Sequence, residues 1–291
     1  NRVSKGTYEL GSVFKPFTFA AALNMKLIEP STEFLDLPKS INCAGFPIRE
    51  YDEKLPKNLT AEQILVRSGN IGSVRIAQKV GEEKFKSFLE KIGVIGEINF
   101  DIDEIAVYDD FSMGKCKLAT ASFGHGIATT LLQLAKGYAV ISNGGYNVNP
   151  KLILSESNEK KGQKELLLNK DVSEKIVNIL RKVVTNEEGT AGLANVNGYE
   201  IAGKTGTAEQ AIDGQYSKTK INTFASVFPS SNPKFVFIVM LDSPRGSKTY
   251  VYNYRNKDGS FIGTPFNTAG WTSVEVAGQI IEKIGPILAT K

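Results

Sequence analysis

The first half of the chain carries apolar residues at the three- and four-residue spacing of a helical face. This pattern predicts helices at about residues 12–26, 60–67, 71–80, 82–92 and 129–142. Thr60 followed by Gln63 predicts a capping box at the start of the second helix, and Thr129 is the expected N-cap of the fifth. Pro16 removes the helical bond to the Ser12 carbonyl, which predicts a tightened, 3-10-like first turn.

The pattern changes in the last third of the chain, where strand signals replace helical ones. Strands are predicted at residues 199–207, 222–228 and 235–241, and further helices at about 172–184 and 274–287. The proline-flanked turn at residues 229–233 joins the last two strands, so we expect an antiparallel hairpin. Residues 31–59 are rich in proline, glycine and aspartate and should be irregular.

Helices at both ends around a late antiparallel sheet predict an α+β fold. We expect one domain over residues 1–291, in which residues 1–30 and 146–291 form a sheet lobe packed by the N- and C-terminal helices. Residues 31–145 should form an inserted all-helical lobe. With 291 residues, of which 41% are hydrophobic, there is ample chain to bury a core.

The charge pattern excludes a nucleic-acid-binding surface, because the net charge is only +4 and the lysines form no dense block with aromatic residues. His125 is the only histidine, which excludes a multi-histidine metal site, and we expect no cofactor. Cys43 and Cys116 have no metal-ligand spacing; they fit a reduced compartment or two free buried thiols, which leaves the redox context open.

No apolar run approaches the roughly 18 residues needed to span a bilayer, and the polar start does not resemble a signal peptide. The abrupt start close to the candidate nucleophile indicates a chain shortened from a longer protein.

Ser12 and Lys15 form the first candidate catalytic pair. Residues three apart share a helical face, so the serine hydroxyl and the lysine amine can meet. Lysine can take the serine proton only if burial or a neighbouring cation lowers its pKa. The same Ser-x-x-Lys spacing begins at Ser12, Ser112, Ser157, Ser217 and Ser231. Only the copy at Ser12 opens a long apolar helix, and alone it would more often be an ordinary capping serine.

Two further elements carry candidate chemistry. Ser68-Gly69-Asn70 lies between two predicted helices, where Ser68 can relay a proton and the Asn70 amide can meet a substrate carbonyl; a plain polar turn is the alternative.

Lys204-Thr205-Gly206-Thr207 lies in the strand predicted at residues 199–207. Gly206 weakens a strand unless something approaches its backbone closely, and Lys204, Thr205 and Thr207 suit a substrate carboxylate. The alternative is a strand with a glycine bulge.

Ser-x-x-Lys, Ser-x-Asn and Lys-Thr-Gly occur here in the order typical of penicillin-binding proteins and class A β-lactamases. The chain resembles class B penicillin-binding proteins over essentially its whole length, with the division-specific (septal) branch closest and the elongation-specific branch second. The stretches that carry the resemblance are residues 8–16, 67–72, 123–127 and 202–209.

The resemblance implies a D,D-transpeptidase with the penicillin-binding and serine β-lactamase-like fold. Ser12 would attack the D-Ala-D-Ala end of a peptidoglycan stem peptide, with Lys15 as base and Ser68 as proton relay. Asn70, Lys204, Thr205, Gly206 and Thr207 would bind the substrate. Backbone N–H groups of Ser12 and Thr207 would form the oxyanion hole, and β-lactams would acylate Ser12.

The resemblance also implies partners and a location. We expect a glycan-polymerising partner and division proteins, and a periplasmic or extracytoplasmic domain that is membrane-anchored in the full-length protein. The anchor and an N-terminal module would lie outside this chain.

Other functions stay open. A β-lactam-sensing receptor would be acylated without turnover, and a D,D-carboxypeptidase would use water as the acceptor. A class A β-lactamase needs a deacylating carboxylate; Glu165 in Glu-Leu-Leu-Leu-Asn superficially fits that role but comes far too late after Ser68.

His125 lies between glycines and should shape a turn rather than catalyse. Residues 243–268, with Tyr250, Tyr252 and Tyr254 alternating, form either a short extra hairpin or a mobile rim of the substrate groove.

Overall fold

The computed structural model describes residues 1–101, 116–153, 165–212, 215–245, 251–256, 259–262 and 266–290. Its main sheet has three antiparallel strands in the order β7-β8-β9, with bounds Ala202–Ile212, Gln215–Phe228 and Phe235–Asp242. The last two strands pair from Ile221↔Asp242 to Phe228↔Phe235, which confirms the predicted hairpin. The first strand begins later than predicted and runs further, because its pairing with β8 extends from Ala202↔Val227 to Ile212↔Gln215.

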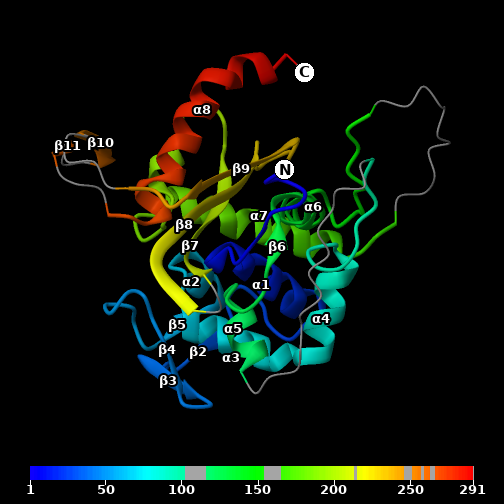
Figure 1. Ribbon diagram of the computed structural model, residues 1–291, viewed down its shortest axis with the longest axis vertical. Helices are drawn as coiled ribbons and strands as arrows, with labels where there is room; N and C mark the ends of the chain where they lie inside the picture. Colours follow the sequence, from blue (N-terminus) through cyan, green and yellow to red (C-terminus); the bar gives the residue numbers. More distant parts are fainter. Residues whose placement is uncertain are drawn as a thin grey trace.

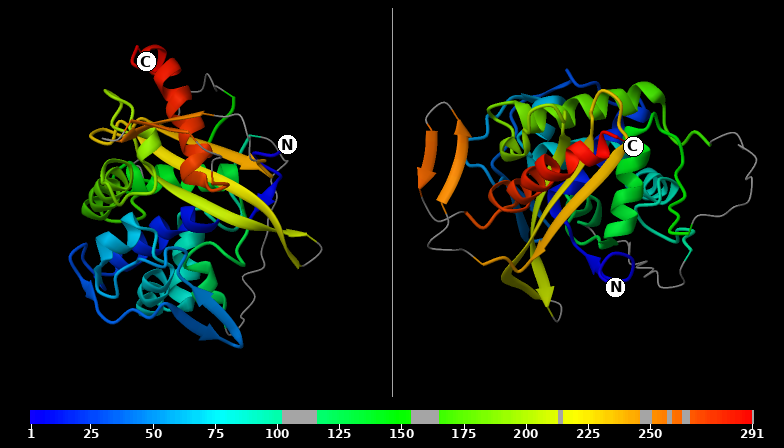
Figure 2. Two further views of the ribbon diagram at one scale, coloured as in Figure 1. Left: turned by 90° about the vertical axis from the view of Figure 1, so that its left-hand side faces the viewer. Right: turned by 90° about the horizontal axis from the view of Figure 1, so that it is seen from above.

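Helices cover both faces of this sheet (Figures 1 and 2). The C-terminal helix α8 (Ser273–Leu288) packs on β8 and β9, while α6 (Leu131–Ser142) and α7 (Lys170–Thr185) pack on the other face. Helix α1 (Lys15–Asn24) lies beyond α7 and contacts α2, α3 and α4, at Ala61–Val66, Asn70–Val80 and Glu82–Lys91. The predicted α+β architecture is therefore confirmed. The division into two lobes stays a prediction, and α6, placed in the helical range 31–145, packs against the sheet.

The start of α1 is a separate 3-10 turn, η1 (Gly11–Phe14). Pro16 occupies the first turn of the α-helix that follows, where its missing N–H costs no helical bond. The predicted tightened turn at Ser12 is therefore confirmed. Every residue from Lys15 to Leu23 is buried, so α1 is a core helix all round rather than an amphipathic surface helix.

The capping boxes illustrate how local signals set helix starts. Thr60 and Gln63 exchange the two predicted bonds, at 2.9 and 3.2 Å. The Thr129 assignment is wrong by one residue: Thr130 is the N-cap of α6 and exchanges the reciprocal bonds with Gln133. The hydroxyl of Thr129 instead donates to the Val94 carbonyl at 2.6 Å.

Residues 31–59 are not wholly irregular. They contain the hairpin β3–β4 (Ser40–Cys43 and Phe46–Arg49), and β2 (Glu33–Phe34) pairs with β5 (Leu59–Thr60). A short pair also joins β1 (Thr7–Tyr8) to β6 (Thr129–Thr130). These strands have two to four residues each, too few for an alternating pattern to appear.

Cys43 and Cys116, whose redox context the sequence left open, form a disulfide; neither a reduced pair nor two free buried thiols is found. The bond joins the end of β3 to the residue before the short helix α5 (Lys117–Ala121), with the two Cα atoms 5.7 Å apart. Within the described ranges, no helix is both long and apolar enough to cross a membrane.

Candidate active site

Ser12 lies in η1, where strand β7 runs directly against the serine turn. Gly206 makes this contact possible, because a Cβ at that position would lie 2.3 Å from the Leu10 carbonyl oxygen and 3.0 Å from the Val13 nitrogen. The predicted close backbone approach at Gly206 is real, and the approaching group is the protein's own serine turn. Two distant segments are thereby packed too closely for any side chain at position 206.

Lys15 follows one turn after Ser12 and is fully buried. Its Nζ donates to the Ser68 carbonyl at 2.5 Å, the Ser68 hydroxyl at 3.1 Å and the Asn70 Oδ1 at 2.8 Å. Ser68 has a left-handed backbone with φ of 63°, uncommon for a residue other than glycine. Strained backbone of this kind concentrates at functional sites. Ser68 thus presents two oxygen atoms to one buried amine.

Lys204 brings a second buried amine to the same serine. Its Nζ donates to the Ser68 hydroxyl at 2.8 Å and to the Thr205 carbonyl at 3.2 Å. The three sequence motifs therefore meet: Lys15, Ser68, Asn70 and Lys204 form one connected hydrogen-bond network.

Burial changes the protonation of both amines. It lowers the pKa of Lys15 from 10.5 to about 7, against the opposing charge of Glu50, because a charged amine is poorly solvated in the core. Burial and the neighbouring charge of Lys15 hold the pKa of Lys204 well below its usual range. A substantial fraction of Lys15 is therefore neutral near pH 7, as a general base requires.

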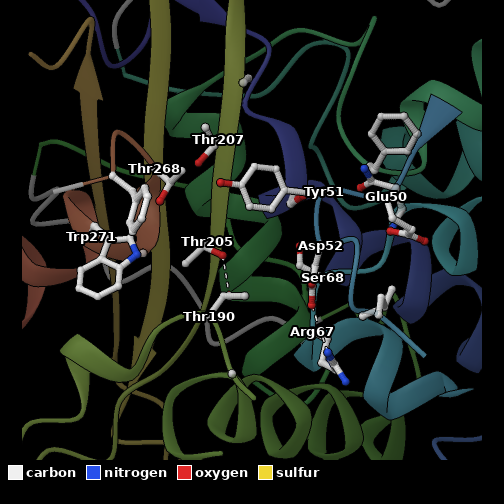
Figure 3. A pocket seen from close by; sticks show the side chains of 18 of the residues that line it. Glu50, Tyr51, Asp52, Arg67, Ser68, Thr190, Thr205, Thr207, Thr268 and Trp271 are labelled. Carbon is white, nitrogen blue, oxygen red and sulfur yellow. Dashed lines mark hydrogen bonds and ion pairs between the residues drawn. The ribbon is translucent and has the colours of Figure 1, made fainter. Parts of the chain in front are cut away.

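A cavity of about 720 Å³ opens beside this network. Figure 3 shows Thr205 and Thr207 between two walls, with Trp271 and Thr268 on one side and Tyr51 on the other. Ser12, Ser68 and Asn70 also line the cavity. The predicted site residues are thus collected around one opening, apart from the buried amines and Gly206, which lie behind it.

The two threonines of the Lys-Thr-Gly-Thr segment are held by neighbouring segments. The Thr205 hydroxyl lies 2.7 Å from that of Thr190, and the Thr207 hydroxyl accepts the Ala269 N–H at 2.9 Å. A hydroxyl that accepts in this way keeps its proton free to donate to a ligand.

Several residues that line or stabilise the cavity were not predicted. Arg67 is 14% exposed and joins two walls through Asp52, at 3.1 Å, and Glu188, at 2.9 Å. Glu50, Thr190 and Trp271 also line the cavity. None of these four residues belongs to one of the three short motifs. Only Arg67 could have been suspected from the sequence, because it directly precedes Ser68.

His125 has the predicted place in a turn, between Gly124 and Gly126, both with positive φ. It also lines the cavity, which the sequence did not indicate. Its Nδ1 is buried without a hydrogen-bond partner among the described residues, and burial lowers its pKa.

Glu165 does not line the cavity; its carboxylate accepts the Asn147 side-chain amide at 2.9 Å. In the segment 243–268, β10 (Val251–Asn256) and β11 (Gly259–Ile262) form a hairpin, which confirms the simpler alternative. Tyr250 lies outside the described residues. Phe266 and Thr268 line the cavity, and the mobile rim stays a prediction.

Among the residues that the structure describes, no cluster of three histidine, cysteine, aspartate or glutamate side chains could hold a metal ion. A serine on a helix-initiating turn, followed one turn later by a buried lysine, matches the class of serine enzymes in which lysine replaces histidine as the base.

The chain belongs to the family of penicillin-binding protein transpeptidase domains, because the family model "Penicillin binding protein transpeptidase domain" matches residues 1–258.

Two curated relatives illustrate the match. The chain is 29% identical to "Probable peptidoglycan D,D-transpeptidase FtsI" of Caulobacter vibrioides, over 100% of this chain and 48% of that protein. It is 31% identical to "Probable peptidoglycan D,D-transpeptidase PbpC" of Pseudomonas aeruginosa, over 84% of this chain and 43% of that protein. The chain thus spans about half the length of the curated relatives it matches.

Solved structures agree on the fold. The apo transpeptidase domain of Burkholderia pseudomallei penicillin-binding protein 3 superposes with a TM-score of 0.82 at 24% identity, covering 99% of this chain and 82% of that one. Penicillin-binding protein 3 of Mycobacterium tuberculosis, complexed with aztreonam, gives 0.79 at 26% identity, covering 98% of this chain and 64% of that one.

Proposed function

We propose that this domain is a peptidoglycan D,D-transpeptidase that cross-links stem peptides through an acyl-enzyme on Ser12. The observation that carries the proposal is the buried network of Lys15, Ser68 and Lys204 beside the cavity that Ser12 lines. Membership of the transpeptidase-domain family supports the same reaction.

The proposed reaction begins when neutral Lys15 takes the Ser12 proton and the serine oxygen attacks the penultimate D-Ala carbonyl. Backbone N–H groups of Ser12 and Thr207 stabilise the oxyanion. Ser68, in contact with both amines, relays the proton to the departing D-Ala nitrogen. The amine of a second stem peptide then attacks the ester carbonyl, its proton passes by way of Lys15 to the departing Ser12 oxygen, and the new amide bond is the cross-link.

Substrate binding follows the same geometry. Asn70 offers its side-chain amide to the donor peptide, and Thr205 and Thr207 donate to its terminal carboxylate. Lys204 lies behind them and donates to the Thr205 carbonyl. Gly206 keeps β7 against the serine turn. A β-lactam would enter as a mimic of the D-Ala-D-Ala end and leave Ser12 acylated.

We also propose an extracytoplasmic location, with a membrane anchor elsewhere in the full-length protein. The Cys43–Cys116 disulfide supports this location, because disulfides form and persist mainly in oxidising compartments. We further propose a septal role, with a glycan-polymerising partner and division proteins; the likeness to a protein named FtsI supports this role.

A turnover assay separates this function from its alternatives. The protein is incubated with a stem pentapeptide ending in D-Ala-D-Ala and an amine acceptor, and the products are identified by mass spectrometry. A transpeptidase releases D-Ala and forms the cross-linked product. Released D-Ala without that product indicates a carboxypeptidase, no turnover despite acylation by penicillin indicates a receptor, and steady hydrolysis of penicillin indicates a β-lactamase.

A further inference from the structure

Glu50 is a cavity-lining carboxylate that belongs to none of the three motifs. It directly follows β4, and its own N–H extends the hairpin ladder by donating to the Lys39 carbonyl at 3.3 Å. Figure 3 places it on the wall that also carries Tyr51 and Asp52. The β3–β4 hairpin thus delivers a carboxylate directly to the site.

The Glu50 side chain binds the start of α3. Its two oxygens accept the N–H groups of Asn70, at 2.6 Å, and Ile71, at 2.8 Å. The first N–H groups of a helix lack intrahelical partners, and Gly69 at the N-cap has no side chain to satisfy them. A carboxylate from a distant hairpin therefore supplies the missing cap and complements the positive end of the helix dipole.

The neighbouring Arg49 holds the other end of Asn70. Its carbonyl oxygen accepts the Asn70 Nδ2 at 2.9 Å, while the Asn70 Oδ1 accepts from Lys15 Nζ at 2.8 Å. Backbone and side chain of Asn70 are thus both fixed by consecutive residues of one segment. The orientation of the amide toward the catalytic amine depends on Arg49 and Glu50.

We propose that Glu50 is a positioning residue for acyl transfer, an inference that rests on the function proposed above. Glu50 holds Asn70, and Asn70 in turn holds the amine of Lys15 in the geometry that activates Ser12. Glu50 makes this contribution without touching the reacting atoms.

The charge of Glu50 gives this role a distinctive signature. Its negative charge raises the pKa of Lys15, against the lowering by burial. Besides burial, the charge of Lys15 in turn lowers the pKa of Lys204 of β7 and of His125 after α5, so these two titratable groups face the same amine. Glu50→Gln removes the carboxylate charge and also replaces one of the two oxygens that accept the helix N–H groups. The start of α3 should therefore be held less firmly, the pKa of Lys15 should fall, and the base should be active at lower pH.

The experiment measures the second-order rate of acylation by penicillin as a function of pH for wild type, Glu50→Gln and Glu50→Asp. In Glu50→Gln we expect the plateau rate to fall about tenfold, because small displacements of reacting groups are costly in rate. The midpoint of its acid limb should move down by roughly half a pH unit. Glu50→Asp keeps the charge with a shorter reach, so it should lose rate but keep the wild-type midpoint.

Glu53→Gln is the matched control, since it removes an exposed carboxylate three residues away and should change neither quantity. A wild-type rate and midpoint in Glu50→Gln would overturn the inference, and so would a lost rate with an unmoved midpoint. If Glu50→Gln does not fold, Glu50→Asp decides: a reduced rate at unchanged Tm supports the inference, and an unchanged rate rejects it. Failure of the wild type itself to be acylated would count against the proposed function instead.

Discussion

Lys15 and Lys204 are two amines that share one hydroxyl inside the protein core. A charged amine without a counter-ion is costly to bury, and two adjacent ones repel each other. The protein therefore favours a state in which at least one of them is neutral. Neutrality converts a side chain that is normally an acid at pH 7 into a base.

Acylation should follow the protonation of Lys15. Because its pKa is about 7 and only the neutral amine can accept a proton, the acylation rate should rise from pH 6 to pH 8 with a midpoint near 7. Lys15→Met, which keeps an unbranched side chain but has no base, should acylate at least about a hundredfold more slowly. Stopped-flow measurement with a fluorescent penicillin checks both; a flat profile or an unimpaired variant would contradict this role.

Gly206 should be intolerant of even one added methyl group. Gly206→Ala places a Cβ 2.3 Å from the Leu10 carbonyl, so the serine turn and β7 must separate. We expect a loss of about 1–3 kcal/mol in unfolding free energy and a larger loss of acylation rate. Gly192→Ala is the control, because nothing lies within 4 Å of its added Cβ. Equal urea midpoints for the two variants would refute the close-packing argument.

At the scale of elements, local signals were readable and long-range pairings were not. The Thr60 capping box, the 3-10 turn before Pro16 and the β8–β9 hairpin each depend on residues a few positions apart. The short strands within residues 31–59 depend partly on tertiary contacts, as β2 with β5 shows. The bond between Cys43 and Cys116 spans 73 positions, and spacing alone cannot reveal such a pair.

The disulfide should contribute measurably to stability. A cross-link that closes a loop of 73 residues restricts the unfolded chain, and its removal in Cys43→Ser should cost roughly 2–4 kcal/mol. Urea unfolding measures the difference, and the wild type under reducing conditions should match the variant. Cys116→Ser should behave identically, since either change removes the same bond. An unchanged midpoint in both variants would show that the bond does not form in solution.

At the scale of the whole molecule, the fold brings three distant segments to one cavity. The residues of the three motifs could be predicted because their types and order are distinctive, and the structure places them together. Glu50 and Arg67 could not be predicted from the sequence. A carboxylate that caps a remote helix and an arginine that joins two walls of a cavity have no local sequence signature. Supporting contacts emerge only once the chain is folded.

The buried amines should make stability depend on pH. The folded-state pKa of Lys15 is about 7 and its ordinary value is 10.5, so between these values the unfolded chain binds more protons. The unfolding free energy should therefore rise with pH through that window, and the lowered pKa of Lys204 acts in the same direction. Urea unfolding at pH 7, 8 and 9 should show this rise, with a smaller rise in Lys15→Met. Equal slopes for both proteins would contradict burial of a titrating Lys15.

The most direct test of the account is the intact mass of the protein after incubation with penicillin. We expect a persistent adduct of one penicillin on the wild type and on Ser231→Ala, which disrupts an exposed copy of the Ser-x-x-Lys spacing. Ser12→Ala should carry no adduct. An adduct that survives in Ser12→Ala, or its absence from the folded wild type, would contradict the assignment of Ser12 as the nucleophile.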